Sequence, residues 1–510
     1  MRINSHWLLV AILMLAAMLR LAHAGTESLW FDEAFAVTAA RMDAMSILRG
    51  EAEPVLPPFY FLTLHVWQRA ADESEVAVRA LSALCSLLAL AVAFRLAARL
   101  FGRRAGLWTA GLMAISPFQV YYAQEARPYA LCVLLSGGVL WAFLEIVMFS
   151  TTTTKDTKYT KTFVSFVVKN KQGVLMWAGY VVLAVLGLYT HYFFGLMLAG
   201  IHLWAAIYRR RWAFWRRLLI GDGCAALLFL PHLNTALSRT QTVTGSFWIE
   251  RPSVLAILKT FDFLFFAGTT PTWLVPLALF GTLGLTAVVG FDLARFYRRD
   301  RSRTPGIALV LSVIALPIVV AFVLSQVGGS IYLDRSFALL SPAYLVLLAV
   351  GLAVRPRRSP SLALAAMLGV IAVVSLAHFY FWPDVAKPRF REAGRFLAEH
   401  AGSDDVLLNL HDSTYFSLRY YAPQVESYVL ENNRPWLLPE AWPRFGVRVT
   451  ADWIAALPAG TRLWVAVEPR LYDGQQQEIM AGLEEDWQWL ERFAALGIRL
   501  CLFQKPTETQ

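Results

Sequence analysis

Residues 297–326 read YRRDRSRTPGIALVLSVIALPIVVAFVLSQ, a basic cluster that runs directly into a long apolar stretch. The cluster contains Arg298, Arg299, Arg301 and Arg303, and no charged residue follows them before Asp334. A membrane-spanning helix needs about 17 to 25 predominantly apolar residues. This stretch is long enough, and it predicts a helix that crosses a bilayer with a cationic loop at one end.

Stretches of the same kind recur along the chain. Hydrophobic residues make up 57% and charged residues 16% of its 510 positions, a balance that water-soluble globular proteins of this size do not normally have. We count about eleven candidate spans, which centre on Leu13, Leu88, Ala110, Gly138, Val182, Leu198, Ala226, Leu279, Ile314, Leu347 and Val370. The span around Ala110 is the weakest, because Ser116-Pro117 cuts it short. The sequence thus predicts an α-helical polytopic membrane protein with about 11 transmembrane helices.

The loops between these spans alternate in charge. One set is rich in cations: Arg99/Arg103/Arg104, Lys155/Lys158/Lys161/Lys169/Lys171, Arg209/Arg210/Arg211/Arg216/Arg217, Arg295/Arg298/Arg299/Arg301/Arg303 and Arg355/Arg357/Arg358. The other set has few, among them Arg41, Arg127, Arg251 and Arg335. Because loops rich in Lys and Arg stay in the cytoplasm, we expect the N-terminus inside and the C-terminal end outside. The net charge of +10 reflects these loops, and they do not form the shared basic face that nucleic-acid binding requires.

The long apolar stretches end before residue 383, and this change in pattern divides the chain into two predicted domains. Residues 1–382 form a membrane domain, in which residues 25–75, here called the first loop, are expected outside. The Thr/Lys-rich segment 150–171 has no packing pattern and is expected to be a disordered cytoplasmic insertion. Arg2, an apolar core and Ala22-His23-Ala24 also fit a cleavable signal peptide, but we expect the first span to remain as an anchor.

Residues 383–510 form the second predicted domain. Their pattern predicts a helix at 390–400 and strands at 406–410, 427–430, 463–467 and 498–503. Strands that alternate with helices indicate a small α/β domain, and the loop charges predict that it lies outside the cytoplasm. Arg389, Arg391 and Glu392 are expected on its solvated face.

The first loop contains the most prominent carboxylates. Asp32 and Glu33 follow Trp30-Phe31 directly, and Glu51 and Glu53 precede Pro57-Pro58. A carboxylate here could accept a proton from an attacking hydroxyl or amine, or hold a cation that binds phosphate. Asp32 and Glu33 fit an ordinary helix start as well, because acidic side chains are favourable there.

Three further segments of the expected outer face carry polar residues. Arg127 could bind a phosphate, with Tyr122 and Glu125 positioning a polar head group, or it could pair with Glu125 within an aromatic belt. His191 lies in a very short turn, where a histidine is either interfacial or a ligand. Arg335 is a second phosphate candidate, unless it snorkels or pairs with its neighbour Asp334.

The sequence has no nucleotide-binding glycine loop, no dinucleotide fingerprint and no zinc-type Cys/His spacing. Energy for a reaction must therefore arrive with a substrate. An activated lipid that enters sideways from the bilayer meets this requirement.

Four stretches, in this order, carry a resemblance to a known family. They are WFDEA at 30–34; PPFY at 57–60 with EVAVR at 75–79; LFGRRAG at 100–106 through SPF at 116–118 to YYAQEARPY at 121–129; and YTHY at 189–192. With them the chain resembles the bacterial membrane glycosyltransferases of the GT-C class, in particular the family related to protein O-mannosyltransferases and to the aminoarabinose transferase of lipid A.

The resemblance implies a GT-C fold and an inverting transfer of a sugar from a polyprenyl-phosphate donor to a lipid, glycan or protein. The reaction would take place on the outer side of a bacterial cytoplasmic membrane. The resemblance also implies roles for residues: Asp32 as general base with Glu33 beside it, Tyr122, Glu125, Arg127 and His191 as cavity-lining residues, and Arg335 as a donor-phosphate ligand. The alternative is a flippase or transporter of lipid-linked sugars, although no internal repeat typical of transporters is visible.

The chain departs from the family at one place in the first loop. Members usually carry Asp or His directly before the Pro-Pro pair, where this chain has Val55-Leu56. That difference leaves Glu51 or Glu53 to supply the acidic group. If a divalent metal ion takes part, Glu53 and His191 are its candidate ligands.

Overall fold

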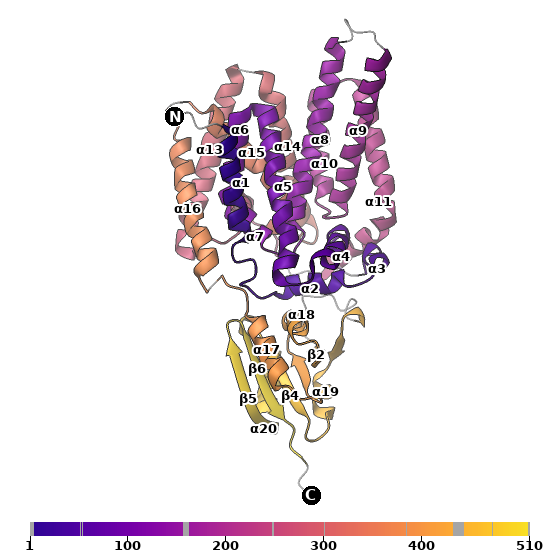
Figure 1. Ribbon diagram of the computed structural model, residues 1–510, viewed down its shortest axis with the longest axis vertical. Coiled ribbons are helices and arrows are strands. Elements are labelled where there is room, and N and C mark those ends of the chain that lie inside the picture. The colour runs from indigo at the N-terminus through magenta and orange to yellow at the C-terminus, as the bar shows by residue number, and fades with distance from the viewer. Residues whose placement is uncertain are drawn as a thin grey trace. The chain divides into compact units, whose positions relative to one another are not determined.

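The computed structural model describes residues 5–507 except 52, 54, 157–162, 247–248, 300, 357, 384, 432–442 and 472. The chain forms two compact units (Figure 1). The membrane unit comprises Met1–Ala22, Val55–Tyr60 and Arg79–Phe381, and the C-terminal unit comprises His23–Pro54, Phe61–Val78 and Trp382–Gln510. Most of the first loop thus belongs to the same compact unit as the C-terminal residues.

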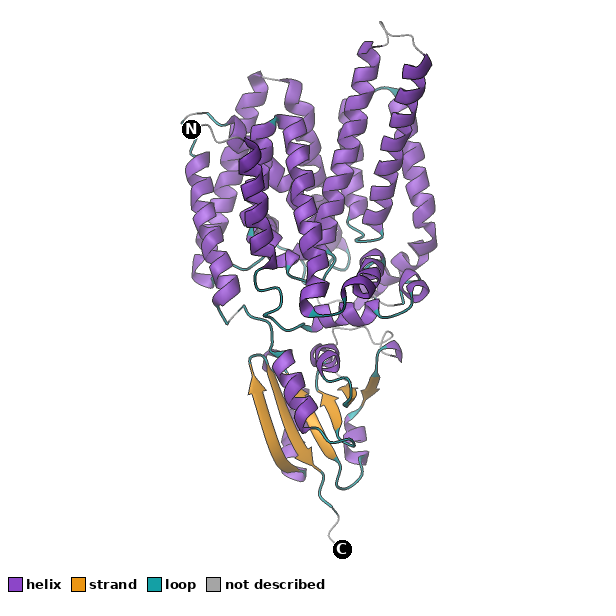
Figure 2. Cartoon of the chain, viewed as in Figure 1, coloured by secondary structure: helices purple, strands orange, loops and turns teal. Residues whose placement is uncertain are grey.

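The membrane unit is built from helices (Figure 2). Its α-helices are α1 (Ser5–Leu21), α5 (Glu75–Phe101), α6 (Arg103–Ile115), α7 (Pro117–Ala123), α8 (Tyr129–Asp156), α9 (Phe163–Leu188), α10 (Phe194–Tyr208), α11 (Trp212–Ser246), α12 (Val254–Phe266), α13 (Val275–Arg299), α14 (Thr304–Val327), α15 (Ser341–Val354) and α16 (Ser361–Phe381). Short 3-10 helices are η1 (Thr272–Leu274), η2 (Arg301–Arg303) and η3 (Asp334–Leu340).

Every predicted span centre lies on one of these helices. Within the described residues, 7 helices are long and apolar enough to cross a membrane, and three shorter apolar helices accompany them at His6–Leu21, Gly173–Leu188 and Phe194–Tyr208. The predicted multi-pass architecture is confirmed, whereas the number of eleven spans is not. The weakest candidate, α6, has only 13 residues, because the chain breaks at Ser116 and restarts at Pro117 as α7.

The predicted insertion at residues 150–171 is described only in part. Helix α8 continues through Asp156 and α9 starts at Phe163, so helical backbone occupies both ends of the segment. Residues 157–162, in its middle, lie outside the described residues.

The break between α6 and α7 leaves carbonyl groups at the end of α6 without helical partners. Lipid offers no hydrogen bonds to satisfy them. Arg20 of α1 does so: its Nη2 donates to the Met113 carbonyl at 2.9 Å, its Nη1 to the Ala114 carbonyl at 3.4 Å, and its Nε to Ser86 Oγ at 2.8 Å. The side chain of Arg20 is 0% exposed. A single buried cation therefore stabilises the interrupted helix.

The C-terminal unit contains a six-stranded sheet of order β3-β2-β1-β4-β6-β5. Its strands are β1 (Val406–Asn409), β2 (Glu426–Leu430), β3 (Val447–Val449), β4 (Arg462–Val467), β5 (Gln488–Ala495) and β6 (Ile498–Gln504). The first four are parallel to one another, and β6 is antiparallel to both β4 and β5. The four predicted strands are present. β3 and β5 were missed, because β3 is three residues long and β5 is an edge strand that directly follows a helix.

Helices cover both faces of this sheet. They are α17 (Phe390–His400), α18 (Asp412–Tyr421), α19 (Ala451–Ala456) and α20 (Gly474–Asp486). The unit also contains η5 (Pro469–Leu471) and, from the first loop, α2 (Phe31–Ala40), which packs against α18, α3 (Ala44–Leu48) and most of α4 (Phe59–Ala71). Successive side chains of β4 point to opposite faces of the sheet. Trp464 therefore packs with Leu397 of α17 on one face, whereas Val465 packs with Leu483 of α20 on the other. The predicted α/β domain is therefore a three-layer arrangement, with the predicted helix 390–400 observed as α17.

Close packing of α17 against α18 yields a stability prediction. A Cβ atom at Gly394 would lie 2.3 Å from the Tyr421 Cβ, whereas a Cβ at Gly482 in α20 would meet nothing within 4 Å. We expect Gly394→Ala to destabilise the C-terminal unit by about 1–3 kcal/mol through overpacking. Gly482→Ala should instead stabilise its helix by about 0.5–1 kcal/mol. Thermal unfolding and protease resistance of the full chain in detergent measure both, and equal behaviour of the two variants would contradict the packing.

Candidate functional site

The end of α7 and the turn that joins it to α8 hold three of the predicted residues. Tyr122, Glu125 and Arg127 are all buried. Gln124, within this turn, donates from Nε2 to the Leu19 and Ala22 carbonyls at the end of α1, both at 2.9 Å. The Arg127 backbone N–H donates to the Glu125 carbonyl at 2.8 Å. The turn is thus anchored at α1 and internally hydrogen-bonded.

His191 lies in the turn between α9 and α10. The neighbouring Tyr189 carbonyl accepts a hydrogen bond from the Phe59 backbone N–H at 2.8 Å, which joins this turn to the Pro-Pro segment. Burial, reinforced by the cation of Arg335, lowers the pKa of His191 to about 4. Its Nδ1 accepts a hydrogen bond from the Phe193 N–H at 3.3 Å. The imidazole is therefore neutral at pH 7, with its proton on Nε2.

Arg335 lies at the start of η3. Its charge acts on His191 and also on Tyr122. Burial, with Tyr129 and Glu125 adding to it and Arg335 opposing it, raises the pKa of Tyr122 well above its ordinary value. Tyr122 therefore stays a protonated hydrogen-bond donor.

Ring packing supports the same arrangement. Phe193, beside His191, packs edge-on against Phe337 of η3 with centroids 5.4 Å apart. Tyr122 packs against Phe263 of α12, the helix whose Thr260 donates a hydrogen bond to Asp334 of η3 at 3.3 Å. The structure thus brings together the α7–α8 turn, the α9–α10 turn and η3 in the membrane unit. Of the predicted residues, Tyr122, Glu125, Arg127, His191 and Arg335 belong to this group of segments.

Asp32 and Glu33 belong to the C-terminal unit, in the first turn of α2. The Glu33 side chain is 0% exposed, and its Oε2 accepts a hydrogen bond from Lys387 Nζ at 2.8 Å. Asp32 is partly exposed instead. Two adjacent carboxylates therefore have different surroundings: one forms a buried ion pair, and the other is partly exposed.

The two candidate metal ligands lie in different units. Glu53 is buried in the C-terminal unit, and His191 belongs to the membrane unit. In the part of the chain that the structure describes, no group of three or more His, Cys, Asp or Glu side chains is placed to hold a metal ion. Metal binding by Glu53 and His191 stays a prediction.

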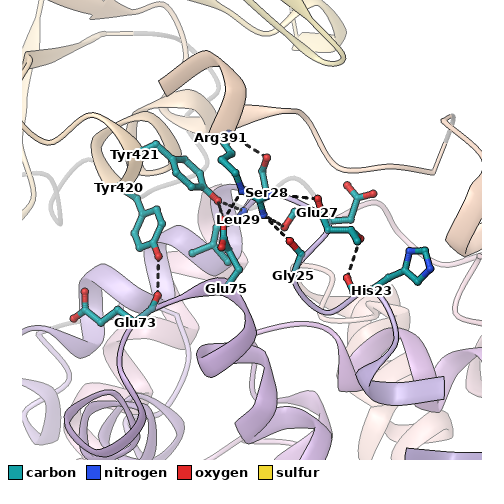
Figure 3. Close-up of polar contacts among 11 residues, drawn as sticks. His23, Gly25, Glu27, Ser28, Leu29, Glu73, Glu75, Arg391, Tyr420 and Tyr421 are labelled. Carbon is teal, nitrogen blue, oxygen red and sulfur yellow. Dashed lines mark hydrogen bonds and ion pairs between the residues drawn. The ribbon is translucent and has the colours of Figure 1, made fainter. Parts of the chain in front are cut away.

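Sequence reasoning missed the polar contacts that Arg391, Tyr421 and Lys387 make with the first loop (Figure 3 shows those of Arg391 and Tyr421). The expectation that Arg391 is solvated is wrong, because its Nε pairs with Glu75 Oε1 at 2.8 Å and both side chains are mostly buried. One signal was available: Arg391 is three residues before Gly394 and so shares the buried side of α17. Its partner, 316 positions away, could not be read from a pattern.

Comparisons with known proteins bear on the fold. Residues 55–156 match the family model described as dolichyl-phosphate-mannose-protein mannosyltransferase. No curated protein sequence gives a significant match.

Solved structures resemble the chain over nearly its whole length. ArnT from Cupriavidus metallidurans in the apo state is 14% identical, with a TM-score of 0.62 and 98% of each chain covered. The same protein bound to undecaprenyl phosphate is 15% identical, with a TM-score of 0.60 and 98% of each chain covered. The Archaeoglobus fulgidus oligosaccharyltransferase tethered with an acceptor peptide is 12% identical, with a TM-score of 0.55, 99% of this chain and 74% of that chain covered. These likenesses confirm the predicted resemblance: the chain has the fold of the GT-C class of membrane glycosyltransferases.

Proposed function

We propose that this chain is an inverting glycosyltransferase that moves a sugar from a polyprenyl-phosphate donor to an acceptor on the outer side of a bacterial cytoplasmic membrane. The observation that carries the proposal is the packing of the His191 turn against η3, which brings Arg335 into the same group of segments as neutral His191 and Tyr122. A cation flanked by neutral hydrogen-bond donors suits a phosphate that must be held and then released with more negative charge. The likeness to a protein bound to undecaprenyl phosphate supports the donor class.

The chemistry needs one base and no covalent nucleophile. The acceptor oxygen or nitrogen forms a bond to the anomeric carbon while its proton passes to Asp32. The bond from the anomeric carbon to the phosphate oxygen breaks at the same time, and its electron pair leaves with the polyprenyl phosphate. One displacement of this kind inverts the configuration at the anomeric carbon.

Residues of the membrane unit serve the leaving group. Arg335 and Arg127 supply positive charge to the phosphate as the bond breaks. Tyr122 and His191 Nε2 donate hydrogen bonds, and Glu125 orients the neighbouring groups of the turn. Glu53 supplies the acidic group that the family carries before the Pro-Pro pair. Asp32, the partly exposed carboxylate of α2, serves the acceptor, and the buried Glu33 pairs with Lys387 in the same helical turn.

Asp32→Asn tests the assignment of the base. We expect the glycoconjugate product to fall at least about 100-fold, because general-base catalysis contributes 10²–10⁴-fold, while the protein stays folded and inserted. The measurement is mass spectrometry of glycolipids and glycoproteins in a deletion strain complemented with each variant. Glu399→Gln, which changes an exposed carboxylate on α17, is the matched control. Normal product with Asp32→Asn would rule out this role for Asp32.

Arg335→Gln tests the phosphate site. Loss of a charge-assisted hydrogen bond should weaken binding of undecaprenyl phosphate to the purified protein by about 10- to 100-fold, or about 1.5–3 kcal/mol. Arg251→Gln removes an exposed arginine of the same unit and should leave the affinity unchanged. Equal effects of the two substitutions would show a general charge effect instead of a site.

The buried neutral His191 makes a pH prediction. The unfolded imidazole binds a proton below about pH 6.5, but the folded one resists protonation until about pH 4. The free energy of unfolding therefore decreases as the pH falls from 6.5 toward 4. The decrease is about 1.4 kcal/mol for each unit by which the pKa differs between the folded and the unfolded protein. Thermal unfolding in detergent should show a smaller loss over this window in His191→Gln. The control His400→Gln, at an exposed position, should follow the wild type; a His191→Gln curve parallel to wild type would contradict the burial.

A further inference from the structure

Lys387 holds the first loop through both its side chain and its main chain. Its Nζ donates to Glu33 Oε2 at 2.8 Å, and its backbone N–H donates to Glu27 Oε2 at 3.1 Å. The side chains of Glu33 and Lys387 are 0% and 13% exposed. Removing one partner of such a buried pair leaves an uncompensated buried charge, which is destabilising. The pair therefore fixes the position of the first turn of α2.

A second group of contacts holds the residues that lead into α2 (Figure 3). Besides pairing with Glu75, Arg391 donates from Nη2 to the Gly25 carbonyl at 2.9 Å. The Tyr421 hydroxyl donates to Glu75 Oε1 at 2.7 Å and accepts from the Leu29 N–H at 2.8 Å. Residues 25–33 are thus held from α17, from α18 and from the segment before α17.

Helix α2 needs this support because its own sequence stabilises it poorly. Its N-cap residue, Trp30, makes no side-chain capping bond, and Trp is not among the residues that cap helices well. A helix of 10 residues is too short to be stable alone in water. Phe31 and Phe35 pack against Phe416 of α18, with ring centroids 5.8 and 5.1 Å apart. Contacts with the C-terminal residues therefore determine where α2 begins and how it is oriented.

We propose that Lys387 is a positioning residue for Asp32. Asp32 directly precedes Glu33 in the same helical turn, so a contact that fixes Glu33 also fixes the direction of the Asp32 side chain. The inference rests on the proposed function, in which Asp32 is the base. It gives residues 382–510 a part in the transfer step itself, through Lys387, in addition to any contact with the acceptor.

Hydrogen exchange of the full chain in detergent tests whether Lys387 holds α2. Lys387→Met should raise exchange at residues 31–36 about tenfold, because the local opening free energy falls. Arg395→Gln, which removes an exposed cation of α17, should match the wild type. If Lys387→Met fails to fold, the double variant Lys387→Met/Glu33→Gln takes its place in the same comparison, because it removes both charges of the pair. Unchanged exchange at residues 31–36 would overturn the inference.

Product formation tests whether the holding matters for transfer. Per inserted protein, Lys387→Met should lower the glycoconjugate product at least about tenfold, since misplacing a catalytic group by 1 Å can lower the rate about 100-fold. Binding of undecaprenyl phosphate should stay within a factor of about two, because a positioning residue acts on the transfer step and not on uniform binding. Lys387→Arg keeps the cation and should restore most of the product. Wild-type product in folded Lys387→Met, or a parallel loss of lipid binding, would overturn the inference.

Asp32→Asn in the same assay separates the two ideas. If Asp32→Asn still makes product, the base assignment of the proposed function is wrong, and the positioning role of Lys387 is wrong with it. If Asp32→Asn is inactive and Lys387→Met is fully active, only the inference about Lys387 is overturned.

Discussion

The absence of water inside a bilayer is the constraint on which the membrane unit depends. Every helix end within it must find hydrogen-bond partners in the protein. Arg20 of α1 satisfies carbonyls at the end of α6, and Gln124 beyond α7 satisfies carbonyls at the end of α1. These reciprocal contacts permit an interrupted helix, and the interruption provides a turn in which Glu125 and Arg127 are buried and held. The polar site is thus a consequence of how the break is satisfied.

In the first loop, two adjacent carboxylates differ in their burial. Asp32 and Glu33 are neighbours in sequence, yet Glu33 is buried and pairs with Lys387, whereas Asp32 is partly exposed. A carboxylate that is buried away from water needs a cation beside it to offset the loss of its hydration. The pair that holds the start of α2 is, in our proposal, also the contact that orients Asp32.

Local patterns predicted the features whose causes are local. The break at Ser116-Pro117, the span centres and α17 follow from proline geometry, apolar length and helical periodicity. Edge strand β5 was missed because it directly follows α20, and its half-exposed residues lack a continuous apolar run. The pair between Glu33 and Lys387 was out of reach for another reason: its partners are 354 positions apart, and neither residue's neighbours reveal the other. The motif order named the candidate site residues, whereas the protonation states of His191 and Tyr122 depend on the burial seen in the structure.

The GT-C fold, the neutral donors around Arg335 and the accessible Asp32 together lead to the central claim, transfer from a polyprenyl-phosphate donor. An experimental structure of the protein with undecaprenyl phosphate tests it most directly. The account predicts that the phosphate lies within hydrogen-bonding distance of the Arg335 or Arg127 guanidinium, with Tyr122 or His191 as a neutral donor. A phosphate bound away from all four side chains, or no bound lipid at saturating concentration, would contradict it.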